Sequence, residues 1–231
     1  GTTNAKSKFI PVSKDALEDC HYKGGKDLVS IYLNNNSNSK LFTGKSLVLG
    51  GSHQKLENND KAFVGDVSAV IMQNLPLWAA WVRVPNLETA LLENYETKID
   101  KIIEESISKN VTNLAGVPTW TAILIQKTLE KTKSENIYDV WPNLEAFFHG
   151  GVNFAPYKSL FKELIPNPKM NYIDSYNASE GFFGIQNELD SDDMLLMLDY
   201  GIFYEFIPMQ EYGSESPKTI TLEDVQVGVN Y

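Results

Sequence analysis

The stretch Asn171–Gly184, NYIDSYNASEGFFG, decides the predicted fold of this chain and the place of its site. The apolar pair Tyr172–Ile173 predicts a short strand, residues 174–177 predict a polar turn, and the aromatic pair that follows starts another strand. Two small residues in this stretch lead to a single acid, Glu180. Because α/β proteins bind ligands at the carboxyl ends of strands, an acid there is placed to hold Mg²⁺ against phosphates. The alternative is an ordinary strand–turn–strand connection with Glu180 in solvent.

The rest of the chain alternates between strand and helix patterns. Short apolar runs predict strands at residues 9–12, 46–49, 111–114 and 144–148. Amphipathic periodicity predicts a helix from Ser13 with a kink at Gly24-Gly25, and further helices at 66–72, 87–109, 119–131 and 157–164. Later runs predict antiparallel strands at 182–187, 194–198 and 202–207. The predicted fold class is α/β: a layered mixed sheet flanked by helices, with a C-terminal antiparallel meander.

Three loops rich in glycine and small residues follow the predicted strands that end near Leu114, Phe148 and Ile173. In a largely parallel sheet such loops gather along one edge, where these sheets bind ligands. We therefore expect the site of this protein at that edge.

Composition excludes some classes of partner. The 231 residues are 42% hydrophobic and 22% charged, which is typical of a globular protein with one large domain or two small ones. The formal net charge of −10 repels nucleic acid and anionic membranes, so we expect neither as a partner. An anionic ligand would need a local cluster of donors.

The cysteine and histidine content and the apolar runs limit the cellular compartment and the kinds of metal site that we expect. One cysteine, Cys20, excludes an internal disulfide, and the cytoplasm is the default expectation. The three histidines lie far apart without zinc-site spacing. No signal peptide is evident, and the richest apolar run, residues 68–85, is broken by polar residues and Pro76.

The first eight residues, GTTNAKSK, combine hydroxyls, one glycine and two lysines, a composition that suits a polyphosphate. They do not form a Walker A loop, because they contain no GK[ST] and no strand precedes them. By itself such a segment is more often a solvated terminus than a phosphate loop.

Five motifs, taken in order, resemble the acyl acid–amido synthetase family of adenylate-forming enzymes, which comprises the auxin-responsive promoter family of plants and its bacterial relatives. The resemblance is to a bacterial-type member and extends over nearly all of the chain. Its most specific motif is Tyr-x-x-Ser-Glu. The motifs are Gly1-Thr2-Thr3 through Lys8, Ala115–Trp120, His149-Gly150-Gly151, Tyr176–Gly181 and Tyr204–Pro208.

The resemblance implies ATP and Mg²⁺ as cofactors and assigns their contacts. It places Thr2, Thr3 and Lys8 on the β- and γ-phosphates. It packs the backbone of His149, Gly150 and Gly151 against adenine, with Tyr176 stacking from the other side. Within the Tyr-x-x-Ser-Glu motif, which includes Ala178, Ser179 donates a hydrogen bond to a phosphate and Glu180 binds Mg²⁺. Glu180 and Lys8 are the implied catalytic residues.

The resemblance also implies the reaction and its partners. Val117, Pro118 and Trp120 would form part of a pocket for a small carboxylic acid, which is adenylated and then transferred to an amino acid. Transfer to coenzyme A, as in related aryl ligases, is one alternative. A non-catalytic domain that binds a nucleotide or a small acid is another.

The chain also departs from the family pattern. Asn4-Ala5 stands where many adenylate-forming enzymes have a second glycine. The chain begins without Met, and neither the third ATP motif nor the small C-terminal domain of the family is found in it. We therefore interpret residues 1–231 as a fragment of the large ATP- and acyl-acid-binding domain, and we expect this fragment alone to be inactive.

Overall fold

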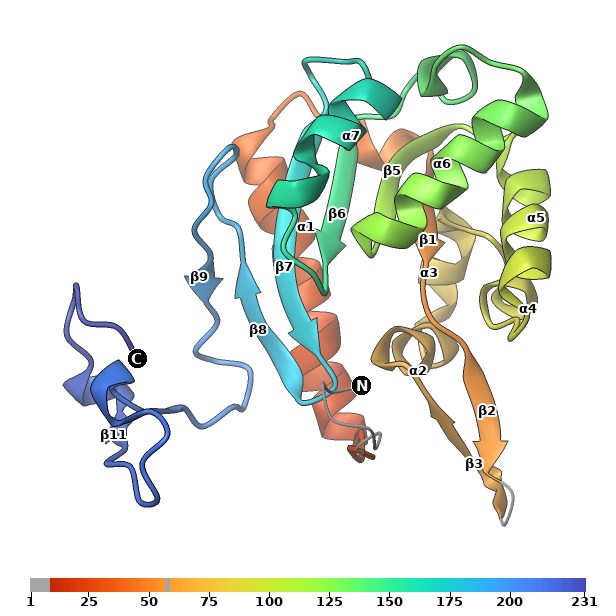
Figure 1. Ribbon diagram of the computed structural model, residues 1–231. Helices are drawn as coiled ribbons and strands as arrows, with labels where there is room; N and C mark the ends of the chain where they lie inside the picture. The colour runs from red at the N-terminus through yellow and green to blue at the C-terminus, as the bar shows by residue number, and fades with distance from the viewer. Residues whose placement is uncertain (1–8, 57–58) are drawn as a thin grey trace. The chain divides into compact units, whose positions relative to one another are not determined.

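The computed structural model describes residues 9–56 and 59–231. These residues fall into two compact units, divided between Tyr200 and Gly201. The first unit contains a seven-stranded sheet in the order β4-β1-β5-β6-β7-β8-β9 (Figure 1). The pairs from β4 to β7 are parallel, whereas β8 and β9 are added antiparallel. Its strands are β1 Lys45–Leu49, β4 Arg83–Val84, β5 Val111–Gly116, β6 Ala146–Gly150, β7 Asn171–Ala178, β8 Gly181–Ile185 and β9 Leu195–Leu196. The α/β fold class with a mixed sheet is confirmed.

Helices cover both faces of this sheet, α1 on one face and α6 and α7 on the other (Figure 1). The α-helices are α1 Lys23–Asn35, α2 Val67–Gln73, α3 Leu77–Val82, α4 Leu87–Ala90, α5 Tyr95–Ser106, α6 Pro118–Thr132 and α7 Lys158–Leu164. A π-helix, Ala16–Tyr22, leads into α1, and 3₁₀ turns lie at Leu41–Thr43, Ile137–Asp139 and Ala155–Tyr157. None of the helices described here has the length and apolar content that a bilayer crossing requires.

The main hydrophobic core lies between the sheet and helices α5, α6 and α7. It contains Ile99, Ile102 and Ile103 of α5, Leu124 and Ile125 of α6, and an aromatic cluster around Phe147. The Phe147 and Phe161 rings stack with centroids 4.9 Å apart. A smaller core on the opposite face joins α1 to β6 and β7. The edge of the sheet that holds the loops is therefore supported from both faces.

Several local predictions are confirmed. The strands expected at 46–49, 111–114 and 144–148 correspond to β1, β5 and β6. The helix expected at 119–131 is α6, which begins one residue earlier at Pro118, where the missing N–H costs no helical hydrogen bond. Ser13 starts the first helix, and its Oγ accepts a hydrogen bond from the Ala16 N–H at 3.0 Å.

Other predictions about the first unit are wrong. Residues 9–12 carry no strand. The long helix expected over 87–109 is two helices, because Asn86 and Asn94 cap α4 and α5 separately. Asn86 Oδ1 accepts from the Thr89 N–H at 3.0 Å, and Asn94 Oδ1 accepts from the Thr97 N–H at 2.9 Å. Side chains that bond local N–H groups stop a continuous helix even where the apolar periodicity continues.

Strand pairing also differs from the expected meander. The turn expected at 174–177 belongs to β7, which runs on to Ala178 and pairs with β8. A hairpin that the sequence did not indicate joins β2 His53–Leu56 to β3 Asn59–Gly65. The run at 202–207 contributes β10 Glu205–Phe206, which pairs antiparallel with β11 Ile220–Thr221 instead of with β9.

The second unit contains this two-stranded sheet and two 3₁₀ turns, Met209–Glu211 and Leu222–Asp224. Its small apolar centre is aromatic, since Phe206 packs edge-on against Tyr231 with ring centroids 5.9 Å apart. The Met209 N–H donates to the Asn230 carbonyl at 3.0 Å, which ties the end of the unit back to its middle.

Candidate active site

The carboxyl ends of four parallel strands meet at one edge of the sheet. Near these ends, Leu49, Gly116, His149 and Asp174 lie side by side in the strand register. The loops that follow these strands, with α1 and α2, surround a cavity of ≈ 1410 Å³. The expectation that glycine-rich loops gather at one edge is therefore confirmed.

The cavity brings together most of the residues that the sequence singled out. The predicted residues in its lining are Val117, Trp120, His149, Gly150, Gly151, Tyr176, Ala178, Ser179 and Glu180. Pro118 is buried at the start of α6 and does not line this cavity. Thr2, Thr3 and Lys8 lie outside the described residues.

The β7–β8 hairpin forms one wall of the cavity. Ala178 pairs with Gly181, so Ser179 and Glu180 form a two-residue turn and are exposed. Tyr176 is 56% exposed, and its ring packs against the Phe183 ring with centroids 5.1 Å apart. One face of a large aromatic ring and one carboxylate are thus available to a ligand.

The segment 149–151 presents backbone more than side chain. The His149 ring is buried and stacks on Phe154, with ring centroids 4.0 Å apart. A side chain at Gly150 would place its Cβ 2.3 Å from the Ser175 carbonyl oxygen, so this position has room only for glycine. Gly151 has φ +81°, a conformation that favours glycine. Residues 149–151 therefore present a flat backbone surface to the cavity.

His21 is a residue of the cavity wall that sequence reasoning left without a role. It is buried on the π-helix, and its Nδ1 donates to Asn177 Oδ1 at 2.9 Å. Burial lowers the pKa of His21, while the hydrogen bond to Asn177 opposes that shift. The neighbouring Phe182 N–H donates to Cys20 Sγ at 3.1 Å, so the π-helix is attached to the hairpin at two places.

Lys98 holds the loop after β1 at another part of the wall. Its buried ammonium donates to the carbonyl oxygens of Gly50 and Gly51 at 2.7 and 2.9 Å. Burial lowers the pKa of Lys98, and the nearby Asp66 carboxylate opposes the shift. A Cβ at Gly51 would lie 1.8 Å from Asp66, so this loop also requires glycine.

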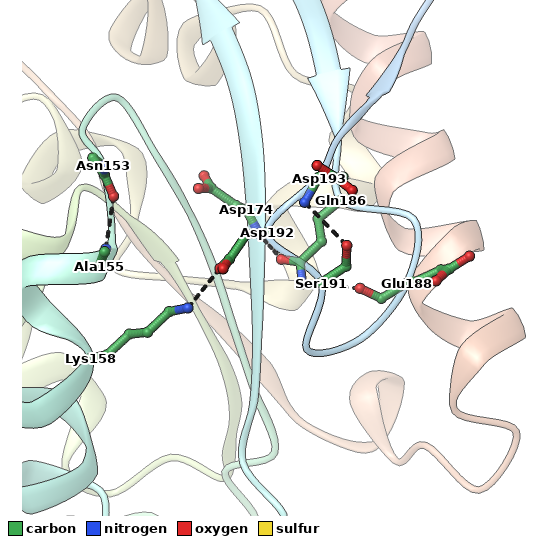
Figure 2. Close-up of polar contacts among 9 residues, drawn as sticks. All are labelled: Asn153, Ala155, Lys158, Asp174, Gln186, Glu188, Ser191, Asp192 and Asp193. Carbon is green, nitrogen blue, oxygen red and sulfur yellow. Dashed lines mark hydrogen bonds and ion pairs between the residues drawn. The ribbon is translucent and has the colours of Figure 1, made fainter. Parts of the chain in front are cut away.

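An ion pair joins two elements at the rim, as Figure 2 shows. Lys158 of α7 donates to Asp192 Oδ1 at 2.7 Å, and Asp192 lies in the loop between β8 and β9. That loop is held from within by Gln186, whose Nε2 donates to the Glu188 carbonyl at 3.0 Å and whose Oε1 accepts from the Asp174 N–H at 2.8 Å. No local signal in the sequence pairs residues so far apart in the chain.

The donors of the hairpin fit a nucleotide and a magnesium ion. Within the part of the chain that the structure describes, no three His, Cys, Asp or Glu side chains gather as a metal site. Mg²⁺ is commonly held by one or two carboxylates together with substrate phosphates, so an exposed Glu180 beside Ser179 is a suitable donor set.

Comparison with known families agrees with the motifs. A model described as the GH3 family N-terminal domain matches residues 1–170. The chain belongs to the GH3 family. A second model, the GH3 family central domain, matches residues 195–231.

Solved structures show the same fold in this GH3 chain. A structure titled "GH3.15 acyl acid amido synthetase" superposes with a TM-score of 0.68 at 15% sequence identity, covering 95% of this chain and 46% of that one. A second, "AtGH3.15 acyl acid amido synthetase in complex with 2,4-DB", gives a TM-score of 0.72 at 14% identity, covering 99% and 48%. The GH3 chain thus spans about half the length of both. A comparison with curated proteins finds no match.

Proposed function

We propose that the full-length protein is an ATP-dependent acyl acid–amido synthetase, which adenylates a small carboxylic acid and transfers the acyl group to an amino acid. The observation that carries the proposal is one cavity in which a flat glycine backbone, an exposed aromatic ring and an exposed Ser-Glu turn face the same space. Family membership and the titles of the two solved structures support it.

The hairpin and the glycine segment would bind the nucleotide. Adenine fits between the backbone of residues 149–151 and the Tyr176 ring, since base–aromatic stacking needs one free ring face. Ala178 lies on the same strand and lines the cavity, where it would present only a methyl group to the nucleotide. Ser179 would donate to a phosphate, and Glu180 would hold Mg²⁺ there. We assign Thr2, Thr3 and Lys8 to the β- and γ-phosphates.

The acyl acid would occupy the part of the cavity beyond the phosphates. Val117 and Trp120 line it at the start of α6, and Ile71 and Met72 of α2 add apolar surface. Pro118 would act beneath this wall, by setting the first turn of α6. We assign residues 1–231 to the large domain of the synthetase.

The chemistry requires positioning and charge neutralisation. A carboxylate resists attack by an amine because its leaving group would be oxide. Attack of its oxygen on the α-phosphate of ATP expels pyrophosphate and gives an acyl-adenylate; the amine nitrogen then displaces AMP, forming the amide and releasing a proton. Glu180 with Mg²⁺ and Lys8 would offset the phosphate charge as it shifts.

The test is acid-dependent exchange of radioactive pyrophosphate into ATP by the full-length protein, with a panel of small alkyl and aryl acids. Exchange that depends on one acid, followed by amide formation when amino acids are added, is the expected result. Exchange followed by thioester formation with coenzyme A would replace the second step. A folded protein that binds ATP but shows no exchange with any acid would contradict the proposal in favour of a binding domain.

A further inference from the structure

Arg83 stands out first by its chemistry. The chain has 20 Lys and Arg residues, and Arg83 is the only arginine among them. A planar guanidinium binds carboxylates with directed hydrogen bonds and stays charged when buried, whereas lysine is a more strongly hydrated point charge. Residue 83 therefore carries the one guanidinium group in the sequence.

The guanidinium lines the cavity without a partner. Arg83 is half-buried on β4, where it pairs with Ser46 of β1. Its Nε and Nη1 atoms are buried and make no hydrogen bond, and among the described residues no carboxylate pairs with it. Burial is the only cause that lowers its pKa. A half-buried guanidinium in a cavity wall, with no carboxylate partner among the described residues, is placed to bind an anion from solution through its accessible part.

Several residues that share the cavity lining with Arg83 are apolar. Strand β1 contributes Val48, and α2 with its following turn contributes Ile71, Met72 and Leu75. Asp66, which precedes α2, also lines the cavity but forms no ion pair with Arg83. An aliphatic or aromatic chain would fit against these apolar residues, with the Arg83 guanidinium available to an anionic group at its end.

The position of Arg83 separates it from the proposed reaction centre. Strands β1, β5 and β6 lie between β4 and β7, so Arg83 and the hairpin strand are separated by four interstrand steps, roughly 19 Å at about 4.8 Å per step. The carboxylate that reacts must lie near the phosphates, on the side of Glu180. Arg83 is therefore placed to contact the other end of an acyl acid.

We infer that the substrate is an acid with a second anionic group at its far end, such as an α,ω-dicarboxylic acid, and that Arg83 binds this second group. The inference rests on the proposed function for the reaction at the first carboxylate. It adds the substrate class and a specificity-determining residue.

The test compares length-matched acids in the pyrophosphate-exchange assay of the full-length protein. Each dicarboxylic acid from butanedioic to dodecanedioic acid is paired with the monocarboxylic acid and with the monomethyl ester of the same length. In the wild type, one diacid is expected to have a KM at least about tenfold lower than its paired monoacid, because the monoacid cannot make the charge-assisted contact with Arg83. Chain length at the minimum KM then reports the distance to Arg83.

Variants assign the effect to the guanidinium. Arg83→Met keeps an unbranched side chain and should raise the KM for the diacid about tenfold or more while leaving the KM for the monoacid near its original value. Arg83→Lys should recover part of the preference. Lys101→Met, which removes a cation from the exposed face of α5, is the matched control and should change neither KM. Thermal melting of each variant verifies folding.

Calorimetric titration of the diacid, without ATP, separates the two proposals. Two results would overturn the inference and leave the synthetase proposal standing. One is pyrophosphate exchange with monoacids and no preference for a diacid; the other is an equal increase in KM for both acids in Arg83→Met. Diacid binding that Arg83→Met abolishes, with no exchange, supports the site and overturns the synthetase. Neither exchange nor binding overturns both.

Discussion

Glu180 owes its proposed role to its place in a two-residue turn, where its carboxylate is exposed and lines the cavity. Glu180→Gln keeps the shape and removes the charge. We expect it to lower Mg²⁺-dependent pyrophosphate exchange about 10²-fold, the usual cost of one preorganised electrostatic contact, while stability changes by less than about 0.5 kcal/mol. Glu188→Gln, at an exposed position outside the lining, is the control. Equal exchange rates in wild type and Glu180→Gln would remove the assigned metal role.

Tyr176 offers a second test at the level of one side chain. If its exposed ring stacks on adenine, Tyr176→Ala should weaken ATP binding by about 1–3 kcal/mol, as for other base–aromatic contacts. Tyr176→Phe retains the ring and should bind ATP nearly as well as wild type. Calorimetric titration with ATP measures both. An ATP affinity that Tyr176→Ala leaves unaltered would exclude stacking.

His21 makes stability depend on pH. Because burial lowers its pKa in the folded protein, the unfolded chain takes up a proton more readily, and protonation favours unfolding. The contribution is complete above the unfolded pKa of about 6.5 and is lost as pH falls below it. Chemical denaturation from about pH 7.5 to about pH 5.5 should show a smaller decrease in the free energy of unfolding for His21→Gln than for wild type. Parallel decreases in the two proteins would contradict this prediction.

At the scale of elements, the two adjacent glycines of α1 differ in how closely they pack against the rest of the protein. Gly24-Gly25 does not interrupt the helix as expected, because α1 continues through both residues. Gly24 instead allows close packing, since a Cβ there would lie 2.4 Å from the Phe182 ring of β8. A Cβ at Gly25 would have no atom within 4 Å.

The two glycines therefore give a matched pair of variants. Gly24→Ala should lower the free energy of unfolding by about 1–3 kcal/mol through overpacking against Phe182. Gly25→Ala should raise it by about 0.5–1 kcal/mol, because alanine is the better helix former. Urea denaturation of both variants measures the difference. A similar change in both would show that α1 does not depend on the Gly24–Phe182 contact.

At the scale of the whole molecule, the formal net charge of −10 works against the folded state by self-repulsion. Raising NaCl from about 20 mM to about 300 mM shortens the range of that repulsion, so Tm should rise. A sucrose solution of equal osmolarity controls for solvent effects unrelated to charge. A Tm that falls with salt would mean that attractive ion pairs, such as Lys158–Asp192, outweigh the net repulsion.

The sequence by itself determined the α/β class, the buried strands β1, β5 and β6, and the start of α6 at Pro118. These features depend on local apolar runs and on the backbone preferences of single residues, which neighbours in the chain encode. It also indicated which loops would meet, because parallel strands bring their carboxyl ends to one edge. The lining of the cavity by the Tyr176–Glu180 segment agrees with that expectation.

Only the tertiary structure decided the features that join distant parts of the chain. Tyr176 lies within a strand because β8 pairs with it, although its polar neighbours favour a turn. His21 bonds Asn177 across 156 residues, and Arg83 reaches the cavity because β4 joins the sheet beside β1. Such contacts leave no periodic or local signal. Their free energy comes from partners that only the folded chain brings together.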